Sequence, residues 1–69
     1  MKTIAENIRT IRQQLGLTQK QFAAKLGYDS RIVSWWEHGR GKPDIDTVKL
    51  IHELFNVDYE EIFDYDLEN

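Results

Sequence analysis

The side chains that could do acid–base or metal chemistry in this sequence are few. Ser34 and His38 stand four residues apart, so on a helix the imidazole could approach the hydroxyl as a base approaches a nucleophile. No acid is placed to orient that histidine, and a chain of 69 residues leaves little room for a pocket that excludes water. His38 and His52 have no metal-ligand spacing, and there is no cysteine. We therefore expect no enzyme, no metal and no cofactor.

The charged residues are divided unevenly along the chain. Residues 1–43 hold eight Lys and Arg against three Asp and Glu, a net charge of +5. Residues 44–69 hold one lysine against nine carboxylates, a net charge of −8. This asymmetry predicts one end that meets phosphate and one that does not. Acidic residues that only solubilise the C-terminal helices would give the same pattern, and the two explanations are compatible.

Length and hydropathy narrow the class of protein. A chain of 69 residues makes one domain with a marginal core, so extra stability must come from tight helix packing or from a second copy. No apolar stretch approaches the roughly 20 residues that span a bilayer, and the N-terminus lacks a secretory segment. We expect a soluble, cytoplasmic protein with no membrane partner.

Signals for helix starts and stops predict three helices in the first half of the chain. Thr3 with Glu6, and Thr18 with Gln21, have the spacing of capping boxes, while Asp29 is a good N-cap for the third helix. Glycines that can adopt the left-handed conformation end these helices at Gly16, Gly27 and Gly39. The apolar residues recur at helical spacing: Ile4, Ile8, Ile11 and Leu15, then Phe22, Ala23 and Leu26, then Val33 and Trp36.

Two more helices follow the irregular segment 38–44, which contains two glycines and a proline. Asp44 caps a helix that ends at Asn56 and has its apolar positions at Ile45, Val48, Ile51, Leu54 and Phe55. Asp58 and Glu61 cap a last short helix, with Val57 placed to pack against Ile62. We predict an all-α fold of five short helices over residues 1–63. The tight turn between the second and third predicts a helix-turn-helix.

A resemblance to a known family covers roughly residues 4–63. Its features occur together at the family's spacing: Thr18-Gln19, Ala23, Gly27, Trp36-Glu37, Gly39, Lys42-Pro43 and the Asn56-Val57 turn. On these residues the sequence resembles the phage-repressor and Cro-like helix-turn-helix family. The resemblance implies a compact, lambda-repressor-like domain. It also implies sequence-specific binding of double-stranded DNA by a small transcriptional regulator.

The resemblance makes the third helix the recognition helix, with its N-terminal half on base edges in the major groove. Arg31 can donate to O6 and N7 of guanine, although a solvent- or phosphate-facing arginine is the alternative. Trp35 is bulky for a groove-facing residue, and could pack on a thymine methyl, a sugar or the following loop. The predicted base-contacting residues are Ser30, Arg31, Ser34 and Trp35.

The resemblance also implies a set of phosphate contacts. The family places a glutamine against a phosphate where Gln19 opens the second helix, beside backbone N–H groups that attract anions. A surface glutamine is the alternative. Phosphate contacts set affinity and register, whereas base contacts set specificity. The predicted phosphate-contacting residues are Thr18, Gln19, Arg40 and Lys42.

Arg12 and Glu37 match positions where the family often has a partly buried ion pair between the first and third helices. We expect that pair, and Trp36, to be structural. Asp29 stands where the family usually has Ser or Thr, so it caps the helix but repels a nearby phosphate.

The last six residues form a predicted acidic tail, 64–69. Phe63, Tyr65 and Leu67 alternate with acidic residues, as in a half-buried strand that pairs with its twin in a symmetric homodimer. A frayed tail is the alternative, in which case the dimer would pair through Leu54, Phe55, Ile62 or Phe63. A protein-binding module on the same fold, such as the antitoxin of a toxin–antitoxin pair, is the alternative function. Its partner would bind the acidic C-terminal half.

Overall fold

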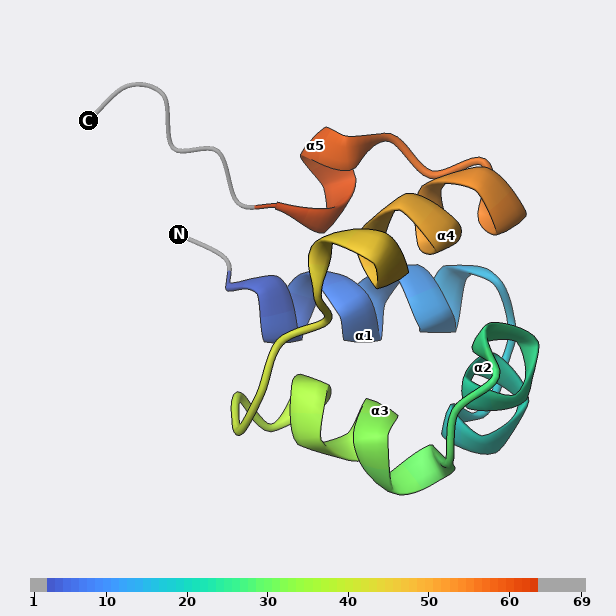
Figure 1. Cartoon of the computed structure of the whole chain (residues 1–69), viewed down its shortest axis with the longest axis vertical. Helices are drawn as coiled ribbons and strands as arrows, with labels where there is room; N and C mark the ends of the chain where they lie inside the picture. Colours follow the sequence, from blue (N-terminus) through green and yellow to red (C-terminus); the bar gives the residue numbers. More distant parts are fainter. Residues whose placement is uncertain (1–2, 64–69) are drawn as a thin grey trace.

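The computed structural model describes residues 3–63, which form five α-helices and no strand. In Figure 1, α1 runs across the middle of the molecule, with α2 and α3 on one side and α4 and α5 on the other. The predicted all-α fold and its number of helices are confirmed for this part of the chain. The helices are α1 (Ile4–Gln14), α2 (Gln19–Leu26), α3 (Ser30–Glu37), α4 (Ile45–Phe55) and α5 (Tyr59–Ile62).

The predicted capping boxes begin α1 and α2. The hydroxyls of Thr3 and Thr18 accept from the backbone N–H groups of Glu6 and Gln21, each at 3.1 Å. The side chains of those two residues accept in return from the N–H groups of the capping threonines, each at 2.9 Å. Helix starts leave backbone donors without partners, and these reciprocal bonds pair two at each start.

A tight turn connects α2 to α3. Gly27 ends α2 with φ of +82°, a left-handed conformation that costs other residues about 1–2 kcal/mol. The Asp29 carboxylate accepts from the N–H of Arg31 at 2.8 Å and so starts α3. Tyr28 stands between them, its hydroxyl 2.7 Å from that of Thr47 and its ring edge-on to Trp36. The turn is therefore braced against α4 as well as against α3.

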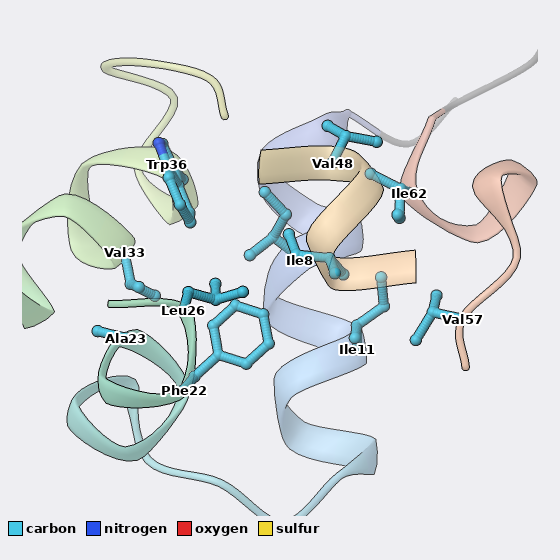
Figure 2. Close-up of a cluster of buried hydrophobic side chains, with 11 residues drawn as sticks. Ile8, Ile11, Phe22, Ala23, Leu26, Val33, Trp36, Val48, Val57 and Ile62 are labelled. Carbon is cyan, nitrogen blue, oxygen red and sulfur yellow. The ribbon is translucent and has the colours of Figure 1, made fainter. Parts of the chain in front are cut away.

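The described residues bury apolar side chains from all five helices in one core. Figure 2 shows them pointing into the same space between α1, the α2–α3 pair and the α4–α5 pair. Phe22 is fully buried, and its ring stacks on that of Phe55 with the centroids 5.1 Å apart. Val57, which precedes α5, and Ile62, the last residue of that helix, are both buried, as expected for two residues predicted to pack together. The core consists of Ile8, Ile11, Phe22, Ala23, Leu26, Val33, Trp36, Val48, Ile51, Val57 and Ile62.

Three residues predicted on apolar helix faces lie at the surface instead. Leu15 is 38 % exposed, because α1 ends one residue before it. Ile45 is 69 % exposed, because it is the first residue of α4 and so lies at the N-terminus of that helix. Leu54 is 51 % exposed, flanking the buried stripe of α4. Helical spacing marks the side of a helix that is apolar, but only the neighbouring helices decide how much of that side is covered.

Asn7 connects α1 to α5, a contact that the sequence does not predict. Its Nδ2 donates to the carbonyl of Ile62 at 3.2 Å, and the residue is 7 % exposed. Asn7→Ala leaves this buried carbonyl unpaired, so we expect a loss of about 1–3 kcal/mol in the free energy of unfolding. Chemical denaturation followed by circular dichroism measures it. A value unchanged from the parent would contradict a buried bond.

None of the helices in residues 3–63 is long and apolar enough to cross a membrane. The predicted strand in the tail, residues 64–69, lies outside the described residues.

Candidate nucleic-acid interface

The helix α3 has a buried side and a solvent side. Val33 is fully buried and Trp36 is 5 % exposed, so both belong to the core. Because a helix turns once every 3.6 residues, Arg31 and Trp35 lie on the other side. Both are exposed, Trp35 by 52 %. The other two predicted base-contacting residues, Ser30 and Ser34, are half-buried.

Arg31 extends from the first turn of α3 into solvent, with 83 % of its side chain exposed. Its Nε lies 3.3 Å from Oδ1 of Asp29, the residue that caps the helix. Hydrogen bonds from the backbone and then from the side chain of Arg31 hold the pKa of Asp29 below its ordinary value. An exposed ion pair contributes little to stability, so the guanidinium can exchange this partner for a base or a phosphate at small cost.

A shallow hollow of about 240 Å³ lies beside the last turn of α3, lined by Ser34, Trp35, His38 and Arg40. The Nδ1 of His38 is 2.7 Å from the backbone carbonyl of Ser34 and 3.4 Å from its hydroxyl. A carbonyl oxygen only accepts hydrogen bonds, so Nδ1 must carry a proton. The nitrogen nearest the hydroxyl therefore cannot act as a base towards it. In residues 3–63 no three His, Asp or Glu side chains gather as metal ligands would.

Thr18 and Gln19 lie at the N-terminus of α2, where backbone N–H groups favour an anion. The Thr18 hydroxyl accepts from the N–H of Gln21 and so serves the capping box. Gln19 is half-buried, and its Nε2 donates to Oε1 of Glu37 at 3.1 Å. Its amide is thus fixed to the end of α3. The sequence predicts a phosphate contact for Gln19 but gives no sign of this second partner.

The predicted ion pair between Arg12 and Glu37 is confirmed. Nε of Arg12 lies 2.6 Å from one carboxylate oxygen and Nη2 lies 3.1 Å from the other, while Nη1 donates to the carbonyl of Leu17 at 2.9 Å. The side chains are 14 % and 4 % exposed. The geometry is bidentate, which is the strong arrangement for a guanidinium and a carboxylate. The pair fixes α1 to the end of α3 and to the loop before α2.

The charge of Glu37 is maintained despite its burial. Burial raises the pKa of Glu37, but hydrogen bonds from Arg12 and Gln19, together with the charges of Arg12 and Arg9, hold it below its ordinary value. The hydrogen bond to Glu37 raises the pKa of Arg12 in turn. Arg9 was not singled out from the sequence, although it lies three residues before Arg12 and so on the same side of α1.

The predicted phosphate-contacting residues divide into two groups in the structure. Arg40 and Lys42 are exposed in the segment between α3 and α4, and Arg40 shares the hollow with Trp35. Thr18 and Gln19 lie at the start of α2, and Gln19 is joined to α3 through Glu37. Side chains that can donate hydrogen bonds to a phosphate therefore lie beside α3 in two places. One is the loop that follows α3, and the other is the start of α2, the helix that precedes it.

Comparison with known proteins identifies the family of this chain. The helix-turn-helix family matches residues 8–62, and the chain belongs to that family. This confirms the resemblance drawn from Thr18-Gln19, Gly27, Trp36-Glu37 and Gly39.

Several relatives carry names that describe what they do. The chain is 33 % identical over 57 residues to the HTH-type transcriptional activator BcrR of Enterococcus faecalis, covering 83 % of this chain and 28 % of that protein. It is 33 % identical over 55 residues to the HTH-type transcriptional regulator ImmR of Bacillus subtilis, covering 80 % and 43 %. It is 32 % identical over 59 residues to the antitoxin PezA of Streptococcus pneumoniae, covering 86 % and 37 %. The chain thus spans less than half the length of these three relatives.

A solved structure has the same fold. The crystal structure of a transcriptional regulator from Listeria innocua matches with a TM-score of 0.81 and 28 % sequence identity, over 91 % of this chain and 59 % of that one.

Proposed function

We propose that this domain binds specific sequences in double-stranded DNA and regulates transcription, with α3 in the major groove. The observation that carries the proposal is the solvent side of α3, which presents Arg31 and Trp35 while Val33 and Trp36 anchor the helix in the core. Membership of the helix-turn-helix family and the names of BcrR and ImmR support it. The proposed location is the cytoplasm, because the named relatives are bacterial proteins and bacterial DNA lies in that compartment.

The proposed roles follow the placement of the side chains. Arg31 donates to a guanine, Ser30 and Ser34 bond to base edges, and Trp35 contacts a thymine methyl or a sugar. Thr18, Gln19, Arg40 and Lys42 bind phosphates on either side of the groove.

Substitution of Arg31 tests base reading. We expect Arg31→Ala to relax the preference at one operator position by about 1–3 kcal/mol, because a bidentate contact to guanine is lost there. Selection of bound sites from random duplex DNA, followed by titration of single-base variants, measures the change. Lys42→Ala is the matched control, since loss of a phosphate contact weakens every sequence about equally. Equal weakening of all sequences by Arg31→Ala would refute its base-reading role.

We further propose that the protein acts as a two-fold homodimer, because one domain reads only a half-site and half-sites stand roughly 34 Å apart. Sedimentation equilibrium at tens of micromolar should give the dimer mass, and a single species of monomer mass would disprove pairing. Deletion of residues 64–69 weakens the dimer if the tail forms the pairing strand. An unweakened dimer assigns the interface to Leu54, Phe55 or Phe63; Ile62, the fourth residue suggested by the sequence, is fully buried in the core of the monomer and is not available for pairing.

An antitoxin role is the second candidate function, favoured by the 32 % identity to the antitoxin PezA. In that role a partner protein would bind the acidic C-terminal half. Co-expression with the product of an adjacent small reading frame tests it. A stable complex of the two proteins, together with growth restored by this chain, supports the role. Normal growth of cells that express the other product alone excludes the role for that pair.

A further inference from the structure

Three polar side chains from three helices meet beside the predicted phosphate site. Glu37, the last residue of α3, accepts at Oε1 from both Nη2 of Arg12 and Nε2 of Gln19, each at 3.1 Å. Its Oε2 accepts from Nε of Arg12 at 2.6 Å. The structural pair between α1 and α3 is therefore also the partner of the residue that opens α2.

We propose that Glu37 is a positioning residue for DNA binding, which fixes the amide of Gln19 so that it meets a phosphate in one orientation. The inference rests on the proposed function and extends it to a residue that does not touch DNA. The Glu37 side chain is 4 % exposed, so its effect passes through Gln19.

The chemistry of the pair determines the orientation of the amide. An ionised carboxylate only accepts hydrogen bonds, so the amide of Gln19 must present its nitrogen to Glu37 and not its oxygen. The Nε2 keeps one further hydrogen for a phosphate oxygen, beside the backbone N–H groups at the start of α2. A free glutamine would lose side-chain entropy on binding, whereas this one is already held.

The charges around Glu37 allow this role. A lone carboxylate next to a phosphate site would repel the phosphate, but Arg12 pairs with Glu37 in a bidentate geometry. The charge of Arg9 also acts on Glu37 and lowers its pKa together with Arg12. Because Arg12 holds both carboxylate oxygens, Glu37 is itself fixed and can fix Gln19 in turn.

A matched pair of variants separates positioning from stability. Arg12→Met/Glu37→Met removes both charges and every acceptor at position 37, whereas Arg12→Met/Glu37→Gln keeps a carbonyl that can accept from Gln19. Replacing both partners of a buried ion pair by apolar residues of similar size is often tolerated, so Arg12→Met/Glu37→Met should fold. Arg12→Met/Glu37→Gln should fold as well, because it also removes both charges and its new amide keeps a hydrogen-bond partner in Gln19. Affinity is measured by fluorescence anisotropy on the duplex selected by the parent, at a temperature where circular dichroism shows each variant folded.

We expect Arg12→Met/Glu37→Met to bind about fivefold more weakly than Arg12→Met/Glu37→Gln, as for one lost hydrogen bond. Adding Gln19→Ala to both should bring this ratio to about one, because the acceptor then has nothing to position. A ratio near one with Gln19 present, or an equal ratio after Gln19→Ala, overturns the proposal. A parent that binds no duplex overturns the proposed function and the inference with it.

The free parent gives a second test that needs neither DNA nor a variant. Heteronuclear NOE values for side-chain amides report how rigid each one is. The Gln19 amide should be as rigid as the backbone, in contrast to that of Gln13, which is exposed on α1. A Gln19 amide as mobile as that of Gln13 overturns the positioning role, whether or not the protein binds DNA.

Discussion

Glu37→Ala should lower the free energy of unfolding by about 3 kcal/mol, because it leaves the largely buried guanidinium of Arg12 without its carboxylate. The figure is at the low end for a broken buried pair, since 14 % of the Arg12 side chain still reaches water. Small domains are stable by only about 5–15 kcal/mol, so the loss is a large share of the total. Urea denaturation at neutral pH measures it.

The exposed pair in the same chain provides the control. Arg31→Ala breaks the ion pair with Asp29, in which the Arg31 side chain is 83 % exposed and the Asp29 side chain 56 %. It should change the free energy of unfolding by less than about 1 kcal/mol.

The pH dependence of stability gives a further check on Glu37. The folded pKa of Glu37 is lowered, so its contribution is present above the ordinary glutamate value of about 4.3 and is lost as the pH falls below that value. Glu37→Ala and the parent should therefore converge in acid, and equal stabilities at neutral pH would contradict the whole account.

DNA affinity should fall by about 100-fold between 50 and 200 mM salt, if Arg40 and Lys42 each neutralise a phosphate in both halves of a dimer. Each such contact contributes a slope of about −0.9 to the plot of log affinity against log salt, because counterions are released from the DNA. Fluorescence anisotropy over a series of salt concentrations measures the slope. Lys42→Ala should make it shallower by about 0.9 per domain.

Lys49 is the matched control for that experiment. It is an exposed lysine on α4, in the acidic half of the chain and outside the proposed contacts. Lys49→Ala removes the same charge but should leave the slope unchanged, because no phosphate contact is lost. A slope near zero for the parent would disprove phosphate binding. An equal change from Lys42→Ala and Lys49→Ala would show that only the net charge matters.

The helix ends and the helix-turn-helix could be predicted from the sequence, since they depend on residues close together in the chain. The Thr3 and Thr18 caps bond to residues three positions away, and Gly27 adopts its left-handed conformation locally. Such interactions look much the same in a peptide and in a folded domain, so residue types and spacing are enough to predict them. The pair of Arg12 with Glu37 lies 25 residues apart and was predicted from the family resemblance.

The contacts that fix the site depend on how the helices pack. Asn7 bonds to Ile62 across 55 residues, Gln19 to Glu37 across 18, and Tyr28 to Thr47 across 19. The spacing of polar side chains along the sequence does not indicate which distant residue each one contacts. A glutamine at the surface and a glutamine bonded to a buried carboxylate cannot be distinguished from the sequence. The partners are chosen when apolar burial brings the helices together, because each buried polar atom must then find a hydrogen bond within reach. For that reason Gln19 could be assigned a phosphate from the sequence, while its connection to Glu37 is a product of the tertiary structure.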